Sequence, residues 1–156
     1  MIVLKPYQNR VLGSLRDFLR ACSSGGVLHQ AFHDVLAANE FPEVNYFPVT
    51  AEGLGASMPY VCLRVPTGGG KTLLACHAAG IAKSELLRAE RAVVLWLVPS
   101  QTILSQTADA LRDPRHPYRL ALETACAGPV EVLTIEEALG LSRGVVEGST
   151  VVLVPT

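Results

Sequence analysis

Five consecutive residues carry the clearest chemical signal in the chain: three glycines, a lysine and a threonine, at positions 68–72. Glycine accepts backbone angles that a side chain forbids, so a glycine run can direct successive N–H groups at one anion. A lysine ammonium can bind phosphate oxygens, and a threonine hydroxyl is suited to ligate Mg²⁺. The string therefore predicts a phosphate-binding loop made by Gly68, Gly69, Gly70, Lys71 and Thr72.

Such a loop needs a strand before it and a helix after it. The β-rich run at 60–65 predicts the strand, and the apolar spacing over 71–88 predicts the helix. The helix N-terminus near Lys71 would add its positive dipole end to the same anion site. The general loop pattern has glycine where this chain has Val65, so the match to that pattern is partial. A glycine-rich turn that happens to precede a helix is the alternative explanation.

Residues 66–72, Pro-Thr-Gly-Gly-Gly-Lys-Thr, resemble motif I of superfamily-two helicases and translocases. With residues 63–65 before them, they resemble the restriction subunit of type III restriction enzymes and related DEAD/DEAH-like proteins. In that superfamily the position of Val65 is commonly a small residue other than glycine. The resemblance implies a RecA-like domain that binds ATP and Mg²⁺, with Thr67 at the nucleotide, Lys71 and Thr72 in catalytic roles, and Thr72 on the metal.

Two further segments extend the resemblance. Residues 4–8, Leu-Lys-Pro-Tyr-Gln, resemble the Q-motif region, which implies that Gln8 reads the adenine edge and that Tyr7 stacks on the base. Residues 97–102 resemble motif Ia, which implies that Ser100 and Gln101 hold a nucleic-acid backbone. The simpler alternatives are that Tyr7 and Gln8 begin an exposed helix and that Ser100 is an ordinary N-cap.

Residues 131–135 and 150–156 resemble the later strands of the same domain. The resemblance makes Thr134 and Thr156 further candidates for nucleic-acid contact. Threonines that simply close strands are the alternative explanation, because β-branched residues are common there.

ATP hydrolysis in that superfamily uses an aspartate–glutamate pair after a buried strand, and no apolar run of this chain ends in one. Glu136 and Glu137 follow the run at 132–135, but two carboxylates in the first turn of a helix explain them. A second RecA-like domain, with its arginine finger, does not fit within 156 residues. We therefore expect the N-terminal part of a longer motor, which binds nucleotide but has negligible hydrolysis by itself.

The composition limits the classes of protein. Hydrophobic residues make up 49% and charged residues 17%, which excludes a disordered chain. The 13 Lys and Arg and 14 Asp and Glu residues give a net charge of −1, so any nucleic-acid contact must be local. The four cysteines include no CxxC pair, and no apolar run is long enough to span a bilayer. We expect a cytoplasmic protein with reduced thiols and no membrane association.

The remaining pattern predicts an N-terminal helical pair followed by alternating strands and helices. Helices are expected at 6–22, 27–39, 100–112 and 135–141, and strands at 92–98, 130–133 and 150–154. The residues at 40–59 are expected to form a loop, and those at 112–119 a solvated basic connector. This order predicts an α/β fold: an incomplete RecA-like P-loop domain with a mainly parallel sheet flanked by helices. Residues 1–59 then form the N-terminal helices and loop, and residues 60–156 the first part of the ATP-binding domain.

These observations predict the ATP-binding part of a superfamily-two helicase or translocase, related to restriction or defence. Its track is expected to be DNA rather than RNA. The rest of the motor and a nuclease or methyltransferase subunit are the expected partners. The rival hypothesis is a stand-alone ATP-binding switch or assembly module without motor activity. A small P-loop kinase would also need a lid and an acceptor-binding acid, and the sequence places neither.

Overall fold

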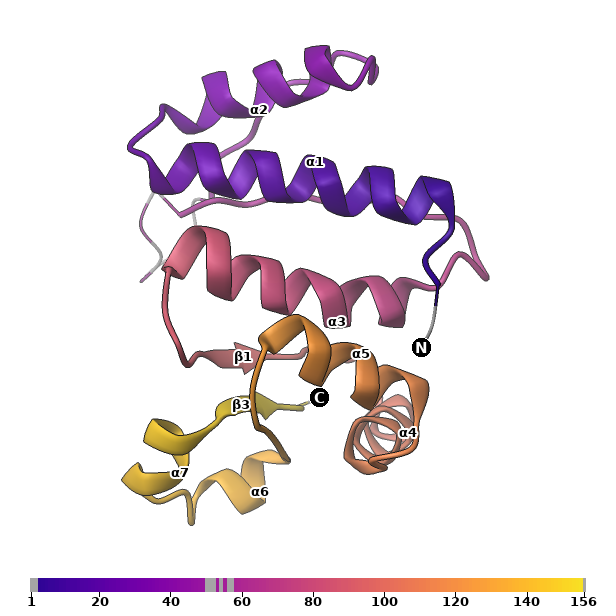
Figure 1. Cartoon of the computed structure of the whole chain (residues 1–156), viewed down its shortest axis with the longest axis vertical. Coiled ribbons are helices and arrows are strands. Elements are labelled where there is room, and N and C mark those ends of the chain that lie inside the picture. The colour runs from indigo at the N-terminus through magenta and orange to yellow at the C-terminus, as the bar shows by residue number, and fades with distance from the viewer. Residues whose placement is uncertain (1–2, 50–52, 54, 56–57, 156) are drawn as a thin grey trace.

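The computed structural model describes residues 3–49, 53, 55 and 58–155. In chain order the elements are α1 (Pro6–Ser23), α2 (Leu28–Ala38), α3 (Lys71–Ile81), η1 (Ala82–Leu87), β1 (Val93–Leu95), α4 (Gln101–Arg112), α5 (Pro117–Cys126), β2 (Val130–Leu133), α6 (Ile135–Ala138), α7 (Arg143–Gly148) and β3 (Thr150–Leu153). Figure 1 shows α2, α1, α3 and the sheet following one another from top to bottom. The N-terminal helical pair thus lies on α3, which separates it from the sheet.

The sheet has three parallel strands in the order β1-β3-β2. Val152 at its centre lies opposite Val94 on one side and Val132 on the other. Parallel pairing requires a crossover between successive strands, and helices supply it here. The predicted α/β class and parallel sheet are therefore confirmed.

Helix α1 follows its sequence pattern closely. Pro6 occupies the first turn, where its missing N–H costs nothing, and Leu12, Leu15 and Leu19 bury one face. The helix ends at Ser23, where two serines and two glycines follow. Helix α2 lies within one residue of its predicted bounds at each end.

Helix α3 is apolar on both sides because it belongs to two cores. Leu73 and Cys76 pack with the sheet, in the cluster that includes Val152 and Leu122 of α5. Leu74 and Ile81 pack instead with the α1–α2 pair. A helix enclosed in this way reads as hydrophobic all round. It continues as predicted to residue 87, the last turns being the π-helical η1.

The predicted strand at 60–65 is wrong: these residues pair with no strand in the described part of the chain. The side chain of Val65 is buried, and that of Val61 is partly buried, in the core formed by α1, α2 and α3. The apolar side chains that suggested a strand therefore pack against helices. The glycine loop at 66–70 follows an extended, unpaired segment instead of a sheet strand.

The strand predicted at 92–98 is real but shorter, and it is not buried on both faces. It forms the edge strand β1, in which Val93 and Leu95 are 56% and 58% exposed. Val94 and Trp96 point to the other face and pack against the sheet core. The continuous apolar run did not distinguish an edge strand from a central one.

The expectation of a solvated connector at 112–119 is wrong from Pro117 onward. Pro117 begins α5, and the His116 Nδ1 atom accepts a hydrogen bond from the Tyr118 N–H at 3.2 Å. Arg119 on this helix donates to the carbonyl of Val130, at 2.7 Å, and Arg112 donates to that of Val132, at 3.1 Å. These guanidinium groups bind the carbonyls on the outer edge of β2. The short helix α7 was also not predicted.

The other elements agree with the prediction. Strand β2 has its predicted bounds, β3 is one residue shorter, and α4 and α6 lie within their predicted ranges. Among the described residues, no helix combines the length and the apolar character needed to cross a bilayer.

Candidate functional site

The glycine loop connects the unpaired segment to α3. Gly68 and Gly70 both adopt left-handed backbone angles, with φ of 76° and 79°. The N–H of Gly69 donates to the carbonyl of Pro66 at 3.0 Å, which closes a tight turn. Figure 1 shows the N-terminus of α3 on the same side of the molecule as the carboxyl ends of β1 and β3. Ligands of parallel α/β sheets bind at this side.

Several N–H groups of the loop are available to a ligand. Within the described part of the chain, those of Gly68, Gly70 and Lys71 have no hydrogen-bond acceptor. Intrahelical bonding starts only with the N–H of Leu74, which donates to the Gly70 carbonyl at 2.9 Å. Free N–H groups between two left-handed glycines and a helix N-terminus form a concave donor set that suits a phosphate.

The backbone angles of Gly69 are not left-handed, so they do not explain why glycine is needed there. The reason is the lack of space for a side chain. A Cβ atom there would lie 2.4 Å from Val65 Cγ1 and 2.9 Å from the Pro66 oxygen. Val65 is buried beside it and fills the volume that a smaller residue would leave open. The Val65 side chain and the Pro66 carbonyl therefore both exclude a side chain at position 69.

Lys71 and Thr72 form the first turn of α3. Lys71 is exposed, and its ammonium donates to the Pro66 carbonyl at 3.1 Å. Thr72 is half-buried at the same end of the helix, and Thr67 is exposed at the start of the turn. The structure thus brings the seven residues 66–72 into one loop around the helix N-terminus.

Helix α1 contacts this loop directly. The hydroxyl of Tyr7 donates to the Gly69 carbonyl at 2.8 Å, and Nε2 of Gln8 donates to the same oxygen at 3.0 Å. Oε1 of Gln8 accepts from the Lys5 N–H at 2.9 Å. Gln8 is buried, so it does not lie on an exposed face of the helix. Residues far apart in the sequence therefore meet at the glycine loop, and the Gly69 carbonyl was not foreseen as their partner.

Comparison with protein families decides the assignment. The family model of the type III restriction enzyme, res subunit, matches residues 1–130, which include α1, the glycine loop and α5. The chain belongs to this family. Comparison with curated proteins found no match, and comparison with solved structures found none either. The res-subunit family places the chain among restriction-related, helicase-like ATP-binding domains.

The residues that resemble motif Ia lie at the start of α4. Ser100 is the N-cap, and its hydroxyl accepts from the Ile103 N–H at 3.4 Å. Gln101 is the first helical residue, and both side chains are exposed. The N-cap interpretation is confirmed, while contact with a nucleic-acid backbone stays a prediction.

Of the two later threonine candidates, Thr134 and Thr156, the structure describes only Thr134. Thr134 caps α6: its hydroxyl accepts from the Glu137 N–H at 3.4 Å, and the Glu137 carboxylate accepts from the Thr134 N–H at 2.7 Å. Its hydroxyl is therefore engaged within the chain. Thr156 lies outside the described residues.

Of the two carboxylates after β2, only that of Glu137 takes part in the α6 cap. Glu136 and Glu137 lie in the first turn of α6, as predicted. The Thr134 N–H, together with Arg112, holds the pKa of the Glu137 carboxyl below its usual range. This carboxylate is committed to a helix cap and an ion pair.

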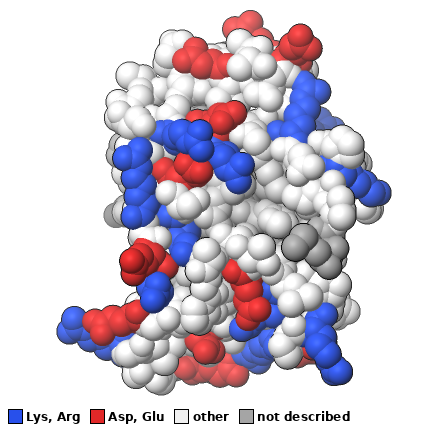
Figure 2. Space-filling view, in the orientation of Figure 1, with Lys and Arg blue, Asp and Glu red and all other residues white. Residues whose placement is uncertain are grey.

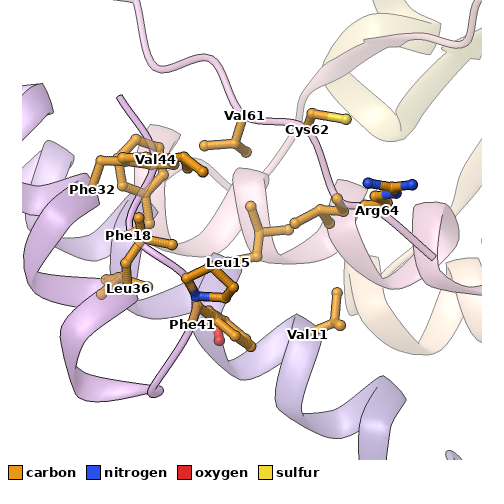
Figure 3. A pocket seen from close by; sticks show the side chains of 14 residues that line it. Val11, Leu15, Phe18, Phe32, Leu36, Phe41, Val44, Val61, Cys62 and Arg64 are labelled. Atoms are coloured by element: carbon orange, nitrogen blue, oxygen red, sulfur yellow. The ribbon is translucent and has the colours of Figure 1, made fainter. Parts of the chain in front are cut away.

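An apolar cavity of about 380 Å³ lies between α1, α2 and the unpaired segment (Figure 3). Its lining is mainly aliphatic and aromatic, including Phe18, Phe32 and Val61, with Arg64 at one end. No residue of 66–72 lines it. This cavity is distinct from the glycine loop, and its apolar lining does not suit a polyphosphate.

The charges on the face in Figure 2 are mixed. Lysines and arginines alternate there with aspartates and glutamates, without a broad basic area. This distribution agrees with the balanced net charge. Any attraction to nucleic acid on this face must come from individual groups.

Proposed function

We propose that the chain binds ATP with Mg²⁺ through residues 66–72 and serves as the nucleotide-binding part of a helicase-like motor on DNA. The observation that supports this most directly is the set of free N–H groups between Gly68 and Lys71, in a chain of the res-subunit family. When bound, ATP would supply the phosphoanhydride bond, and Mg²⁺ would neutralise its phosphates.

Each residue of the loop has a role in this proposal. The N–H groups of Gly68 and Gly70 donate to phosphate oxygens, and the N-terminus of α3 adds its positive end. The ammonium of Lys71 exchanges the Pro66 carbonyl for the terminal phosphates. The Thr72 hydroxyl ligates Mg²⁺, and Thr67 lies at the exposed mouth of the loop. The amide of Gln8 recognises the adenine edge only if it gives up one of its present partners.

The test is an equilibrium titration of the chain with ATP, tripolyphosphate and adenosine. Because the donors recognise phosphate oxygens, ATP and tripolyphosphate should compete for one site. Adenosine, which lacks them, should bind far more weakly. Equal binding of adenosine and ATP, or no binding of tripolyphosphate, would contradict a phosphate site in this loop.

Hydrolysis needs a carboxylate that activates water, and in the described part of the chain no strand is followed by an aspartate–glutamate pair that could hold Mg²⁺ and activate water. Residues 96–100 after β1 and 154–155 after β3 contain no acid. After β2, Glu137 is occupied by the α6 cap, and Glu136 lies exposed in the first turn of α6 with no aspartate beside it. The proposal is therefore that carboxylates from outside these 156 residues complete the active centre. ATP turnover by the chain alone should stay far below about 1 s⁻¹, the low end for ordinary enzymes.

The missing carboxylates also favour a second candidate, a nucleotide-binding switch or assembly module without motor activity. The size of the native polypeptide separates the two. An antibody to α1 should detect a product several times larger than 16.6 kDa if the chain is the front of a motor. A product of 16.6 kDa would favour the switch. For the motor, Ser100 and Gln101 at the exposed start of α4 are the residues proposed to contact the DNA backbone, and a nuclease or methyltransferase subunit is the proposed partner.

A further inference from the structure

Two side chains of α1 converge on one backbone oxygen of the phosphate loop. The Tyr7 hydroxyl and the Gln8 Nε2 atom both donate to the carbonyl of Gly69, at 2.8 Å and 3.0 Å. The orientation of the Gln8 amide is fixed from its other end, because Oε1 accepts from the Lys5 N–H. Two donors on one acceptor define the direction in which that carbonyl points.

That direction also determines where the next N–H points. In a trans peptide the C=O of one residue and the N–H of the next are antiparallel, and no described peptide bond is cis. Since the Gly69 carbonyl points to α1, the Gly70 N–H points away from it. This N–H has no acceptor among the described residues, so it is free to donate to an anion.

The peptide between Gly69 and Gly70 has little intrinsic preference for this orientation. Both flanking residues are glycines, for which left-handed and right-handed backbone angles cost about the same. A flip of this peptide would turn the Gly70 N–H back toward α1 and present a carbonyl oxygen to the anion instead. Restraint from outside the loop is therefore needed to keep the donor in place.

We propose that Tyr7 is a positioning residue for phosphate binding: with Gln8, it holds the Gly69–Gly70 peptide so that the Gly70 N–H donates to the ligand. This inference rests on the proposed function and deepens it. It assigns the Tyr7 hydroxyl to the phosphate end of the nucleotide, whereas the family resemblance implied stacking on the base. The preferred ligand chemistry is accordingly the polyphosphate chain, whichever base it carries.

The decisive variant is Tyr7→Phe, which removes the hydroxyl and keeps the ring. Tyr60→Phe is the matched control, because Tyr60 is 57% exposed and, among the described residues, its backbone N–H donates to Tyr46 while its own hydroxyl makes no hydrogen bond. Dissociation constants are measured for ATP, GTP and tripolyphosphate. Loss of one hydrogen bond should weaken ATP and tripolyphosphate binding alike, by about 3- to 10-fold, and leave the ATP-to-GTP ratio unchanged. Tyr60→Phe should bind all three ligands as the unmodified chain does.

Gln8→Glu provides a second variant, because it keeps an acceptor for the Lys5 N–H but replaces the donor to Gly69 with a carboxylate oxygen. It should weaken tripolyphosphate at least as much as Tyr7→Phe does. If either variant weakens ATP but leaves tripolyphosphate unchanged, the residue contacts the base and the positioning role is wrong. Unchanged affinity for every ligand in Tyr7→Phe also overturns it.

A measurement without ligand separates this inference from the proposed function. The amide resonance of Gly70 in an NMR spectrum of the free chain reports the orientation of the peptide. Tyr7→Phe should shift or split that resonance, and Tyr60→Phe should not. An unmoved Gly70 resonance overturns the inference even if ATP binds. A moved resonance in a chain that binds neither ATP nor tripolyphosphate shows that Tyr7 does orient the Gly69–Gly70 peptide and that the nucleotide assignment has failed.

Discussion

The ammonium of Lys71 lies 3.1 Å from the carbonyl oxygen of Pro66, five residues earlier in the chain. The cation is therefore bound to the backbone of its own loop, and a phosphate must take the place of that carbonyl. Because the side chain is exposed, its removal takes little from the fold. Its effects on binding and on stability should be separable.

Lys71→Ala should weaken ATP binding by about 10- to 100-fold, since a charge-assisted hydrogen bond contributes about 1.5–3 kcal/mol. The melting temperature should change little. Arg115→Ala is the control, because its side chain is 93% exposed and lies in another part of the chain. Calorimetric titration measures the affinity. An unchanged ATP affinity in Lys71→Ala would rule out the loop as the phosphate site.

Gly69→Ala tests whether space dictates that glycine. The added Cβ would meet Val65 Cγ1 at 2.4 Å, and overpacking of this kind costs about 1–3 kcal/mol. Val65→Ala alone leaves a cavity and should cost about 2 kcal/mol. In the double variant the clash with Val65 is gone and the new methyl group fills part of the cavity, while the contact with the Pro66 oxygen at 2.9 Å remains, so the loss of stability should be smaller than the sum but should not vanish. Urea unfolding of all four forms measures the coupling, and strict additivity would show that the two side chains do not compete for space.

Arg119 and Arg143 form a natural comparison, since each is paired with a glutamate four residues later. Arg119 is 17% exposed and also donates to the carbonyls of Leu111 and Val130, whereas Arg143 is 90% exposed. Arg119→Met should therefore lower the free energy of unfolding by about 2–3 kcal/mol, because buried carbonyls lose their donor. Arg143→Met should change it by less than about 0.5 kcal/mol. Equal effects in urea unfolding would mean that the β2 edge gains nothing from Arg119.

Arg119 also shows where sequence reasoning reaches its limit. Helix α1 with its clear apolar stripe, the apolar helix α3 and the strands β2 and β3 could be predicted, because spacing and composition agree there. The role of Arg119 could not, since a basic residue on an unassigned segment looks solvated until the neighbouring strand is placed. Pro117 at the first helical position was the signal that could have revealed α5.

The prediction of a strand at 60–65 failed for a related reason. Its residues suit a strand, but a strand exists only where a partner offers hydrogen bonds, and here helices bury Val61 and Val65. At the candidate site, the string of residues 67–72 identified the loop. The hydrogen bonds from Tyr7 and Gln8 to the Gly69 carbonyl could not be predicted, because every residue has a backbone carbonyl and the residue types do not show which one accepts.

Glu85 links the stability of the fold to pH. Its carboxylate accepts from Arg20 and also pairs with Arg16, and these contacts hold its pKa below the usual range. A depressed carboxyl pKa stabilises the fold above its ordinary value of about 4.3, and this contribution is lost as the pH falls through the folded pKa. Glu85→Gln should therefore lower the urea midpoint at neutral pH and flatten its decline on acidification. Glu90→Gln, at a side chain 92% exposed, should do neither.

The four cysteines should divide by burial. Cys62 is exposed, Cys22 is partly buried, and Cys76 and Cys126 are buried. Burial raises the pKa of the Cys76 thiol to about 12, and burial also raises that of Cys126. Because the thiolate is the reactive form, a chromogenic disulfide reagent should modify Cys62 rapidly and should reach Cys76 and Cys126 only on unfolding. A Cys62→Ser variant that keeps the fast phase would contradict this assignment.

The same burial sets the response to alkaline pH. A thiol whose folded pKa is raised stays protonated in the fold, while in the unfolded chain it ionises near its ordinary value of about 8.5. Ionisation therefore stabilises the unfolded state as the pH rises above that value, and the free energy of unfolding should fall between about pH 8.5 and 12. Cys76→Ala, although less stable at neutral pH because of its cavity, should show a weaker decline over that range. An unchanged slope in urea unfolding would mean that the Cys76 thiol does not control the alkaline limb.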